Sequence, residues 1–202
     1  MKKVIATPPK RTNDPQGMRR RLLDVAAEAF QSGGYQSTGM GDILQAAGVT
    51  GGAMYHHFPS KKALGLAVIR ERVALEIECT WIEPMAAARS TVAGIKSIFK
   101  GIIAGLDERA AVIGCPLSNL TLELALADPE FRVASQEIFR RWRNAIAQKI
   151  RADHVAGVAK HLDADAFATL AVATFSGAMA MAKAEQNTAP LKACLQQLLK
   201  AM

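Results

Sequence analysis

A cluster of hydrogen-bond donors between residues 38 and 61 is the first feature of this sequence that predicts a chemical role. Thr38, Thr50, Tyr55 and His57 each carry a hydroxyl or ring N–H group, and Lys61 adds a positive charge. Such groups donate hydrogen bonds to phosphate oxygens, which fixes the register of a protein on a nucleic acid without reading its sequence. These residue types are therefore suited to contacts with a phosphate backbone, although Tyr55 and His57 taken alone are more often ordinary packing residues.

Two short helices, over about 39–47 and 51–58, must position these donors. Gly48 separates them, because glycine readily adopts the left-handed backbone of a tight turn. Thr50 is typical of a residue that caps the second helix. This is the helix-turn-helix format, in which the second helix enters the major groove of DNA. Its small core is predicted to contain Ile43, Ala46, Ala47, Val49, Met54 and Phe58.

The start of the second helix is predicted to face the DNA directly. Gly51 and Gly52 offer backbone amides, and amides at a helix N-terminus attract anions. Ala53 and His56 are the candidates for contacts to base edges, together with an N-terminal arm. His56 and its neighbour also raise the alternative of a metal pair, but adjacent side chains on a helix diverge. We therefore expect no metal and no cofactor.

Residues 38–64 resemble the TetR family of transcriptional regulators, in its AcrR-like form. The matching positions are Thr38, Ile43, Ala47, Gly48, Val49, Thr50, Gly52, Tyr55, His57, Phe58, Lys61 and Leu64. The resemblance implies a homodimeric repressor that binds a DNA operator and leaves it when a small molecule fills its C-terminal domain. Leu44, Gly39, Gly41 and Gly51 depart from the family pattern, so a ligand-binding protein without DNA affinity stays an alternative, as does an activator.

Charge and helical periodicity fit this organisation. Residues 1–62 contain nine Lys and Arg residues against four Asp and Glu residues, in a chain of net charge +7, and excess positive charge favours a polyanionic partner. Apolar residues recur at helical spacing throughout, which predicts an all-α fold of about nine helices. We expect a flexible basic arm over 1–16, a helix-turn-helix domain of three helices over 17–62, and a ligand-binding and dimerisation domain over 63–202.

Cys115 has the most distinctive chemistry in the C-terminal part. It precedes a predicted helix that begins at Pro116, and a helix N-terminus lowers a thiol pKa and raises its reactivity. The stretch from Gly114 to Leu120, with Glu123 after it, resembles the LmrA/YxaF-type subgroup of the TetR family. Some members of the family sense electrophiles through such a cysteine. The alternatives for Cys115 are thus an electrophile sensor or a small apolar residue beside a turn.

Large apolar side chains of the C-terminal part are candidates for the wall of an effector pocket, although core packing is the alternative for each of them. The predicted ligand-binding residues are Trp81, Phe99, Cys115, Leu120, Trp142, Phe175 and Met179.

The last two helices, at about 163–185 and 189–201, are predicted to form the homodimer interface. Small residues on the first allow a close approach of two copies, and a four-helix bundle about a two-fold axis would result. Residues 166–182 carry no charge, which raises the alternative of a membrane span. Their Ala, Thr, Ser and Gly content favours a close-packed helix instead, so we expect no membrane association.

Other classes of protein find little support in the sequence. No nucleophile–base pair or phosphate-binding glycine motif suggests an enzyme. The three cysteines, Cys79, Cys115 and Cys194, are scattered without metal-ligand spacing, which indicates a reducing cytoplasm.

Overall fold

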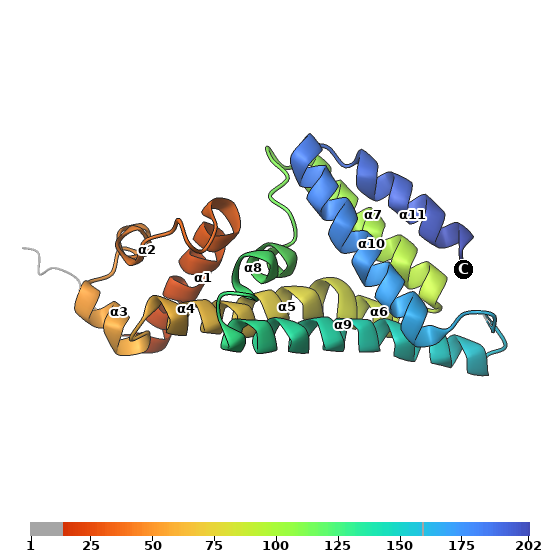
Figure 1. Ribbon diagram of the computed structural model, residues 1–202, viewed down its shortest axis with the longest axis horizontal. Helices are drawn as coiled ribbons and strands as arrows, with labels where there is room; N and C mark the ends of the chain where they lie inside the picture. Colours follow the sequence, from red (N-terminus) through yellow and green to blue (C-terminus); the bar gives the residue numbers. More distant parts are fainter. Residues whose placement is uncertain (1–13, 159) are drawn as a thin grey trace, which may run out of the picture.

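The computed structural model describes residues 14–158 and 160–202, and every regular element in those ranges is helical (Figure 1). When each π-helical turn is counted with the helix that it interrupts, the described part of the chain forms nine continuous helices. The all-α prediction is therefore confirmed.

The first helix, α1 (Pro15–Gly33), begins two residues earlier than the sequence suggested. The Asp14 carboxylate caps it by accepting a hydrogen bond of 2.9 Å from the Gly17 amide, and Pro15 occupies the first helical position. Proline suits this position because its missing N–H needs no partner there. The predicted arm of residues 1–16 is thus too long by two residues, and residues 1–13 lie outside the described part.

Helices α2 (Met40–Ala47) and α3 (Gly51–His57) pack against α1 through a small apolar core. The core residues recur at helical spacing, so each of the three helices turns one face inward. The fully or almost fully buried members are Leu22, Leu23, Ala26, Phe30, Ile43, Ala47, Met54 and Phe58. Ala46 was predicted to belong to this core but is exposed.

One long helix connects this three-helix unit to the rest of the molecule. It consists of α4 (Lys61–Val68), the π-helical turn η1 (Ile69–Val73), α5 (Ala74–Ile77), a second π-helical turn η2 (Glu78–Ile82) and α6 (Glu83–Ala87). Pro84 lies within this helix and does not end it. The second π turn ends at Ile82, so Pro84 falls in the first turn of α6, where its missing N–H does least harm.

The remaining helices form a bundle against the far part of this connecting helix (Figure 1). They are α7 (Thr91–Asp107), α8 (Pro116–Leu124), α9 (Pro129–Val155), α10 (Ala164–Glu185) and α11 (Ala189–Lys200). The long α9 runs beside the connecting helix, and α8 lies between α1 and the bundle. Among the described residues, α10 alone is long and apolar enough to cross a membrane, and 44% of its apolar window is buried within this chain.

A cluster of aromatic rings holds the bundle together. The Trp81 ring centroid lies 4.9 Å from that of Trp142, 4.8 Å from that of Phe175 and 5.7 Å from that of Phe99. Most of these contacts are edge-to-face, which is the favoured arrangement for aromatic pairs. The cluster therefore fixes the connecting helix, α7, α9 and α10 to one another.

We expect Gly65→Ala to destabilise the protein by about 1–3 kcal/mol, because a methyl group there overpacks the contact between α4 and its neighbours. An added Cβ would lie 2.6 Å from Tyr35 Cε2 and 3.0 Å from Phe131 Cζ. Gly41→Ala is the matched control, since its Cβ meets no atom within 4 Å and alanine favours the helix by up to about 1 kcal/mol. Urea denaturation compares the two. Equal stability changes would contradict the close approach at Gly65.

Candidate nucleic-acid interface and ligand pocket

The turn between α2 and α3 has the geometry that the glycine at position 48 predicts. Gly48 adopts a left-handed backbone with φ of 63° and ψ of 36°. Its amide donates to the Gln45 carbonyl at 3.2 Å, and the Val49 amide donates to the Leu44 carbonyl at 3.3 Å. Thr50 then caps α3, because its hydroxyl oxygen accepts a hydrogen bond of 3.4 Å from the Ala53 amide. Two short helices thus meet across a three-residue turn.

Helix α3 presents one face to solvent while its other face is anchored. Met54 is completely buried, whereas Tyr55 is 53% exposed and His56 is also exposed. Thr50 and Gly52 are exposed as well, and the predicted residues Gly51, Ala53 and His57 are half-buried. Within the described ranges, the side chains of Tyr55, His56 and His57 make no hydrogen bond or ion pair.

Two predicted phosphate donors are instead engaged inside the protein. Thr38 is 8% exposed and its hydroxyl donates to the Gly34 carbonyl at 2.7 Å, so this side chain positions α2 and does not point toward a nucleic acid. Lys61 Nζ donates to the Gln36 carbonyl at 3.2 Å and lies 4.6 Å from the centroid of the Tyr35 ring. Sequence reasoning missed the turn at residues 34–37, which supplies both partners.

The basic side chains around this unit have different roles. Arg20 and Arg21 are exposed on α1. Arg19 instead pairs with Glu71 in a two-bond arrangement and lies 5.2 Å from the centroid of the Phe58 ring. Lys62 bridges the carboxylates at the start of α9, at 2.6 Å from each. Arg19 therefore joins α1 to the connecting helix, and Lys62 joins the connecting helix to α9. Arg20 and Arg21 form no ion pair with any residue that the structure describes, which suits them to long-range attraction of an anion.

No group of three or more His, Cys, Asp or Glu side chains in the part of the chain that the structure covers is arranged to hold a metal ion. The His56 and His57 rings lie 5.4 Å apart with a tilt of 64°. They belong to the exposed end of α3.

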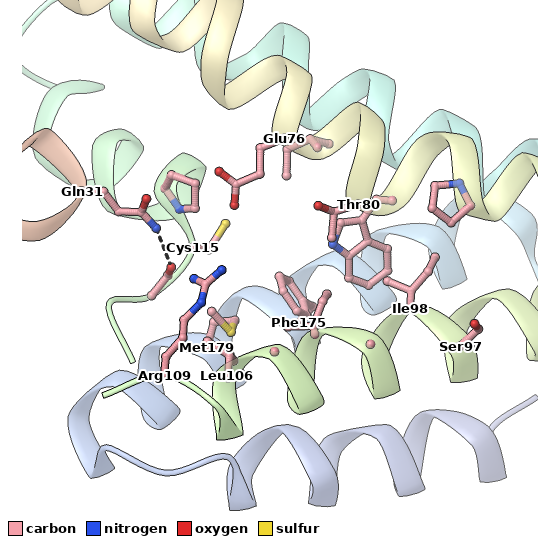
Figure 2. Close-up of a pocket in the computed structure, with 18 residues that line it drawn as sticks. Gln31, Glu76, Thr80, Ser97, Ile98, Leu106, Arg109, Cys115, Phe175 and Met179 are labelled. Carbon is pink, nitrogen blue, oxygen red and sulfur yellow. Dashed lines mark hydrogen bonds between the residues drawn. The ribbon is translucent and has the colours of Figure 1, made fainter. Parts of the chain in front are cut away.

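A cavity of about 430 Å³ lies between the connecting helix, α7, α8 and α10 (Figure 2). Four of the seven predicted ligand-binding residues line it, namely Trp81, Cys115, Phe175 and Met179. The other three do not line it: Phe99 and Trp142 pack behind Trp81 in the aromatic cluster, and Leu120 is buried on α8. For these three, core packing was the better interpretation. The cavity is of the size at which small organic ligands bind.

Polar lining residues that the sequence did not reveal give the cavity its chemistry. Glu76 and Arg109 point toward the Cys115 thiol from opposite sides, and Gln31 enters from α1 (Figure 2). The surrounding protein raises the pKa of the Glu76 carboxyl above its ordinary value by desolvation, and the positive charge of Arg109 opposes this shift. Gly101 and Gly105 leave space on α7, because a Cβ at either position would meet nothing. Their spacing of four residues was the one available sequence signal.

The pKa of the Cys115 thiol is shifted upward, whereas the position before a helix predicted a downward shift. Burial raises the pKa of the thiol, and the polar groups of Leu117 and Ser118 in the first turn of α8 reduce the shift without reversing it. The side chain is only 4% exposed. Desolvation of the thiolate therefore outweighs the attraction of the helix N-terminus, which favours the alternative of a small apolar residue beside a turn.

We expect Cys115 to react with iodoacetamide more slowly than Cys79, by about tenfold or more, since the thiolate is the nucleophile and Cys115 is both buried and protonated. Mass spectrometry of quenched samples gives both rates on the same molecule, with Cys79 as the internal reference. Faster labelling of Cys115 than of Cys79 would restore the electrophile-sensor interpretation.

Comparisons with known proteins agree with both halves of this architecture. Residues 22–68 match the family described as bacterial regulatory proteins of the tetR family. The chain therefore belongs to the TetR family of DNA-binding, helix-turn-helix transcriptional regulators. Within that family, residues 91–197 match the C-terminal domain described as that of LmrA/YxaF-like transcriptional regulators.

Individual relatives extend over most of the chain. The HTH-type transcriptional regulator LmrA of Bacillus subtilis is 26% identical over 186 residues, which cover 90% of this chain and 96% of LmrA. YxaF of the same organism is 24% identical over 181 residues, or 89% and 92% of the two chains. A solved TetR transcriptional regulator from Chloroflexus aurantiacus is 28% identical, with a TM-score of 0.82 over 92% of this chain and 94% of that one.

Proposed function

We propose that this protein is a homodimeric repressor, without enzymatic activity, that binds a palindromic operator in the cytoplasm and is released by a small molecule. The observation that carries the proposal is the exposed face of α3, which follows a helix-turn-helix bend and has no partner for its polar side chains among the residues described. Membership of the TetR family supports a DNA-binding role for that face.

The side chains of α3 divide into two kinds of contact. Thr50, Tyr55 and His57 are suited to phosphate oxygens, as are the backbone amides of Gly51 and Gly52, and these contacts fix the register on the duplex. Ala53 and His56 are suited to base edges in the major groove, where sequence is read. We keep the division near residue 62, so that α1 to α3 form the DNA-binding domain and residues 63–202 bind the ligand and the second subunit.

Helices α10 and α11 supply the surface that we propose for dimerisation. The outward face of α10 is a continuous stripe of small and apolar residues that the chain itself leaves uncovered, and α11 packs beside it with most of its apolar residues buried within the chain. Small residues permit the close approach that a four-helix bundle requires. The exposed stripe on α10 consists of Ala166, Leu170, Ala173, Gly177, Ala180, Met181 and Ala184.

Release of DNA follows from the position of the cavity. The connecting helix carries Trp81 into the cavity and continues to Lys61, directly after α3. A ligand that prefers one orientation of this helix shifts the equilibrium between two conformations of the dimer, which differ in the spacing of the paired α3 helices. The free energy of this shift cannot exceed the difference between the ligand's binding free energies for the two conformations. Only one spacing matches successive major grooves, which lie about 34–36 Å apart.

Selection of bound DNA from a random pool by the purified protein tests this proposal. We expect enrichment of an inverted repeat whose half-sites are about one helical turn apart or a multiple of it. A thermal-shift screen then identifies effectors, each of which should reduce operator binding in a fluorescence anisotropy titration. Recovery of no common sequence, or of a single unpaired half-site, would contradict the proposal.

Tyr55→Phe is expected to weaken operator binding by about five- to tenfold, because a net hydrogen bond to a charged acceptor contributes roughly 1 kcal/mol or more. Stability should be unchanged, since Tyr55 is 53% exposed and its hydroxyl has no partner in the described structure. Anisotropy titrations on the selected operator and on a scrambled duplex measure the effect. The loss should be similar on both sequences, and a loss confined to the operator would contradict a phosphate contact.

A further inference from the structure

The turn between α1 and α2 is held by a carboxylate from the bundle. The Tyr35 amide donates a hydrogen bond of 2.9 Å to Glu123 Oε2, and the Gln36 amide donates one of 2.6 Å to Glu123 Oε1. Glu123 lies on α8, far away in sequence. Gly34 directly precedes these two amides and has a φ of +86°. A Cβ at this position would lie 3.5 Å from Oε2 of Glu123. The backbone of this turn is thus shaped around one side chain.

This turn determines where α2 begins. The Thr38 hydroxyl, one residue before the N-cap of α2, donates to the Gly34 carbonyl at 2.7 Å. The Tyr35 ring is buried against Phe30 and Phe131, with centroid distances of 5.0 and 5.4 Å. Because the turn is short and fixed on both sides, a displacement of the Glu123 carboxylate displaces the start of α2 and, through the bend at residue 48, α3.

The opposite end of α8 belongs to the cavity. Cys115 is the N-cap of α8, and both Cys115 and Pro116 line the cavity (Figure 2). Gln31 of α1 also lines the cavity, and its Nε2 donates a hydrogen bond of 3.2 Å to the Gly114 carbonyl, drawn as a dashed line in Figure 2. The nine residues of α8 therefore span from the cavity wall to the α1–α2 turn.

The bonds to Glu123 are the strongest candidate for a connection between α8 and the α1–α2 turn, whereas the two-bond Arg19–Glu71 pair links α1 to the connecting helix instead. An ionised carboxylate that accepts two amide hydrogens makes charge-assisted bonds in a fixed geometry. Lys62 with Asp128, and Arg72 with Asp24, are ion pairs with at least one substantially exposed partner. Such pairs contribute little and tolerate movement.

We propose that α8 transmits the state of the cavity to the DNA-binding unit through Glu123, which acts as a positioning residue, with the Gln31–Gly114 bond as a second attachment. The inference rests on the proposed function, because it concerns how an occupied cavity alters operator binding. A ligand that displaces Gly114 or Pro116 moves α8 as a rigid rod and pulls the two amides of the turn. Coupling is reciprocal, so operator DNA must in turn restrain the α8 N-terminus.

The alkylation rate of Cys115 measures how strongly operator DNA restrains the α8 N-terminus, and the measurement needs no identified effector. In a Cys79→Ser, Cys194→Ser background, the labelling rate with iodoacetamide follows the fraction of time for which the α8 N-terminus is open. We expect saturating operator DNA to slow the labelling by about fivefold or more in the otherwise wild-type protein. In Glu123→Gln most of the effect of DNA on the rate should be lost, because the glutamine NH2 group replaces one acceptor oxygen and faces a donor amide, and only the part carried by the Gln31–Gly114 bond should remain.

Two further variants make the result decisive. Glu137→Gln removes an exposed charge on α9 that has no partner in the described structure, and it should retain the full effect of DNA. Gln31→Ala should reduce the effect and reports independently if Glu123→Gln does not fold. The inference would be overturned if DNA did not slow labelling in the wild-type background. It would also be overturned if DNA slowed labelling in Glu123→Gln and in Gln31→Ala as much as in that background. Operator affinity is measured separately by anisotropy, so absence of any specific DNA binding would refute the proposed function instead.

Discussion

Gly177→Arg is expected to convert the protein to a monomer and to weaken operator binding by about a hundredfold or more. Gly177 lies on the exposed stripe of α10, where a Cβ meets no atom of its own chain, so the monomer tolerates the substitution. In a close-packed dimer, however, the arginine would be buried opposite its own copy, which is costly for an unpaired charge. In a dimer, binding of one α3 helix holds the second α3 helix at a high effective concentration near its half-site, which raises the affinity for the operator. A monomer loses this gain in affinity.

Analytical ultracentrifugation and anisotropy on the selected operator measure both consequences of Gly177→Arg. Gln148→Arg places the same charge on an exposed position of α9 and serves as the control, which should remain a dimer. A Gly177→Arg protein that is still dimeric and binds the operator with wild-type affinity would show that α10 is not the interface.

Trp142→Ala is expected to lower the free energy of unfolding by about 3–5 kcal/mol, because it removes a completely buried indole ring from the aromatic cluster and leaves a cavity. Trp142 is completely buried, and its ring centroid lies 4.9 Å from that of Trp81 and 5.7 Å from that of Phe175. Since Trp81 and Phe175 also line the ligand cavity, their loss of support should weaken effector binding as well.

Urea denaturation at one fixed protein concentration measures the effect of Trp142→Ala, because dimerisation makes stability depend on concentration. The exposed neighbour Arg143 provides the control, and Arg143→Ala should stay within about 0.5 kcal/mol of wild type. Trp142→Phe should cost less than the alanine variant, since the Trp142 Nε1 group is buried without a hydrogen-bond partner. A loss below about 1 kcal/mol for Trp142→Ala would contradict a tightly packed cluster.

The helix-turn-helix was predictable from sequence because its determinants are local. Gly48 sets the backbone of the turn, Thr50 caps the next helix, and the apolar spacing of α2 and α3 decides which face is buried. Such signals act over a few residues, and the surrounding structure did not overrule them. The α-helical class of the C-terminal part followed from the same periodicity.

The details that sequence reasoning missed depend on contacts between distant segments. Whether Trp142 or Phe99 lines a cavity or supports its wall is decided by how α7 and α9 pack on the connecting helix. The hydroxyl of Thr38 turns inward because the Gly34 carbonyl is close enough to accept its hydrogen. The pKa of Cys115 rises because protein atoms bury the thiol. Gly34 is only four residues from Thr38, but the turn between them is held by Glu123 of α8, which lies far away in sequence.

The contact of Glu123 with the α1–α2 turn could not be predicted from sequence either. The sequence placed Glu123 in a motif with Cys115, but no local rule relates a glutamate to the amides of residues 88 and 87 positions earlier. The structure explains the spacing, because the length of α8 carries the carboxylate from the cavity to the α1–α2 turn.

Site-specific crosslinking tests most directly that α3 contacts the DNA. A photoreactive group is attached to a cysteine placed at His56, in a background without the native cysteines, and the same group at Gln148 is the control, both positions being exposed. The account predicts that irradiation of the operator complex joins position 56 to a base in each half-site, and that position 148 gives no product. Crosslinks from position 148 alone, or none from position 56 while specific binding persists, would contradict it.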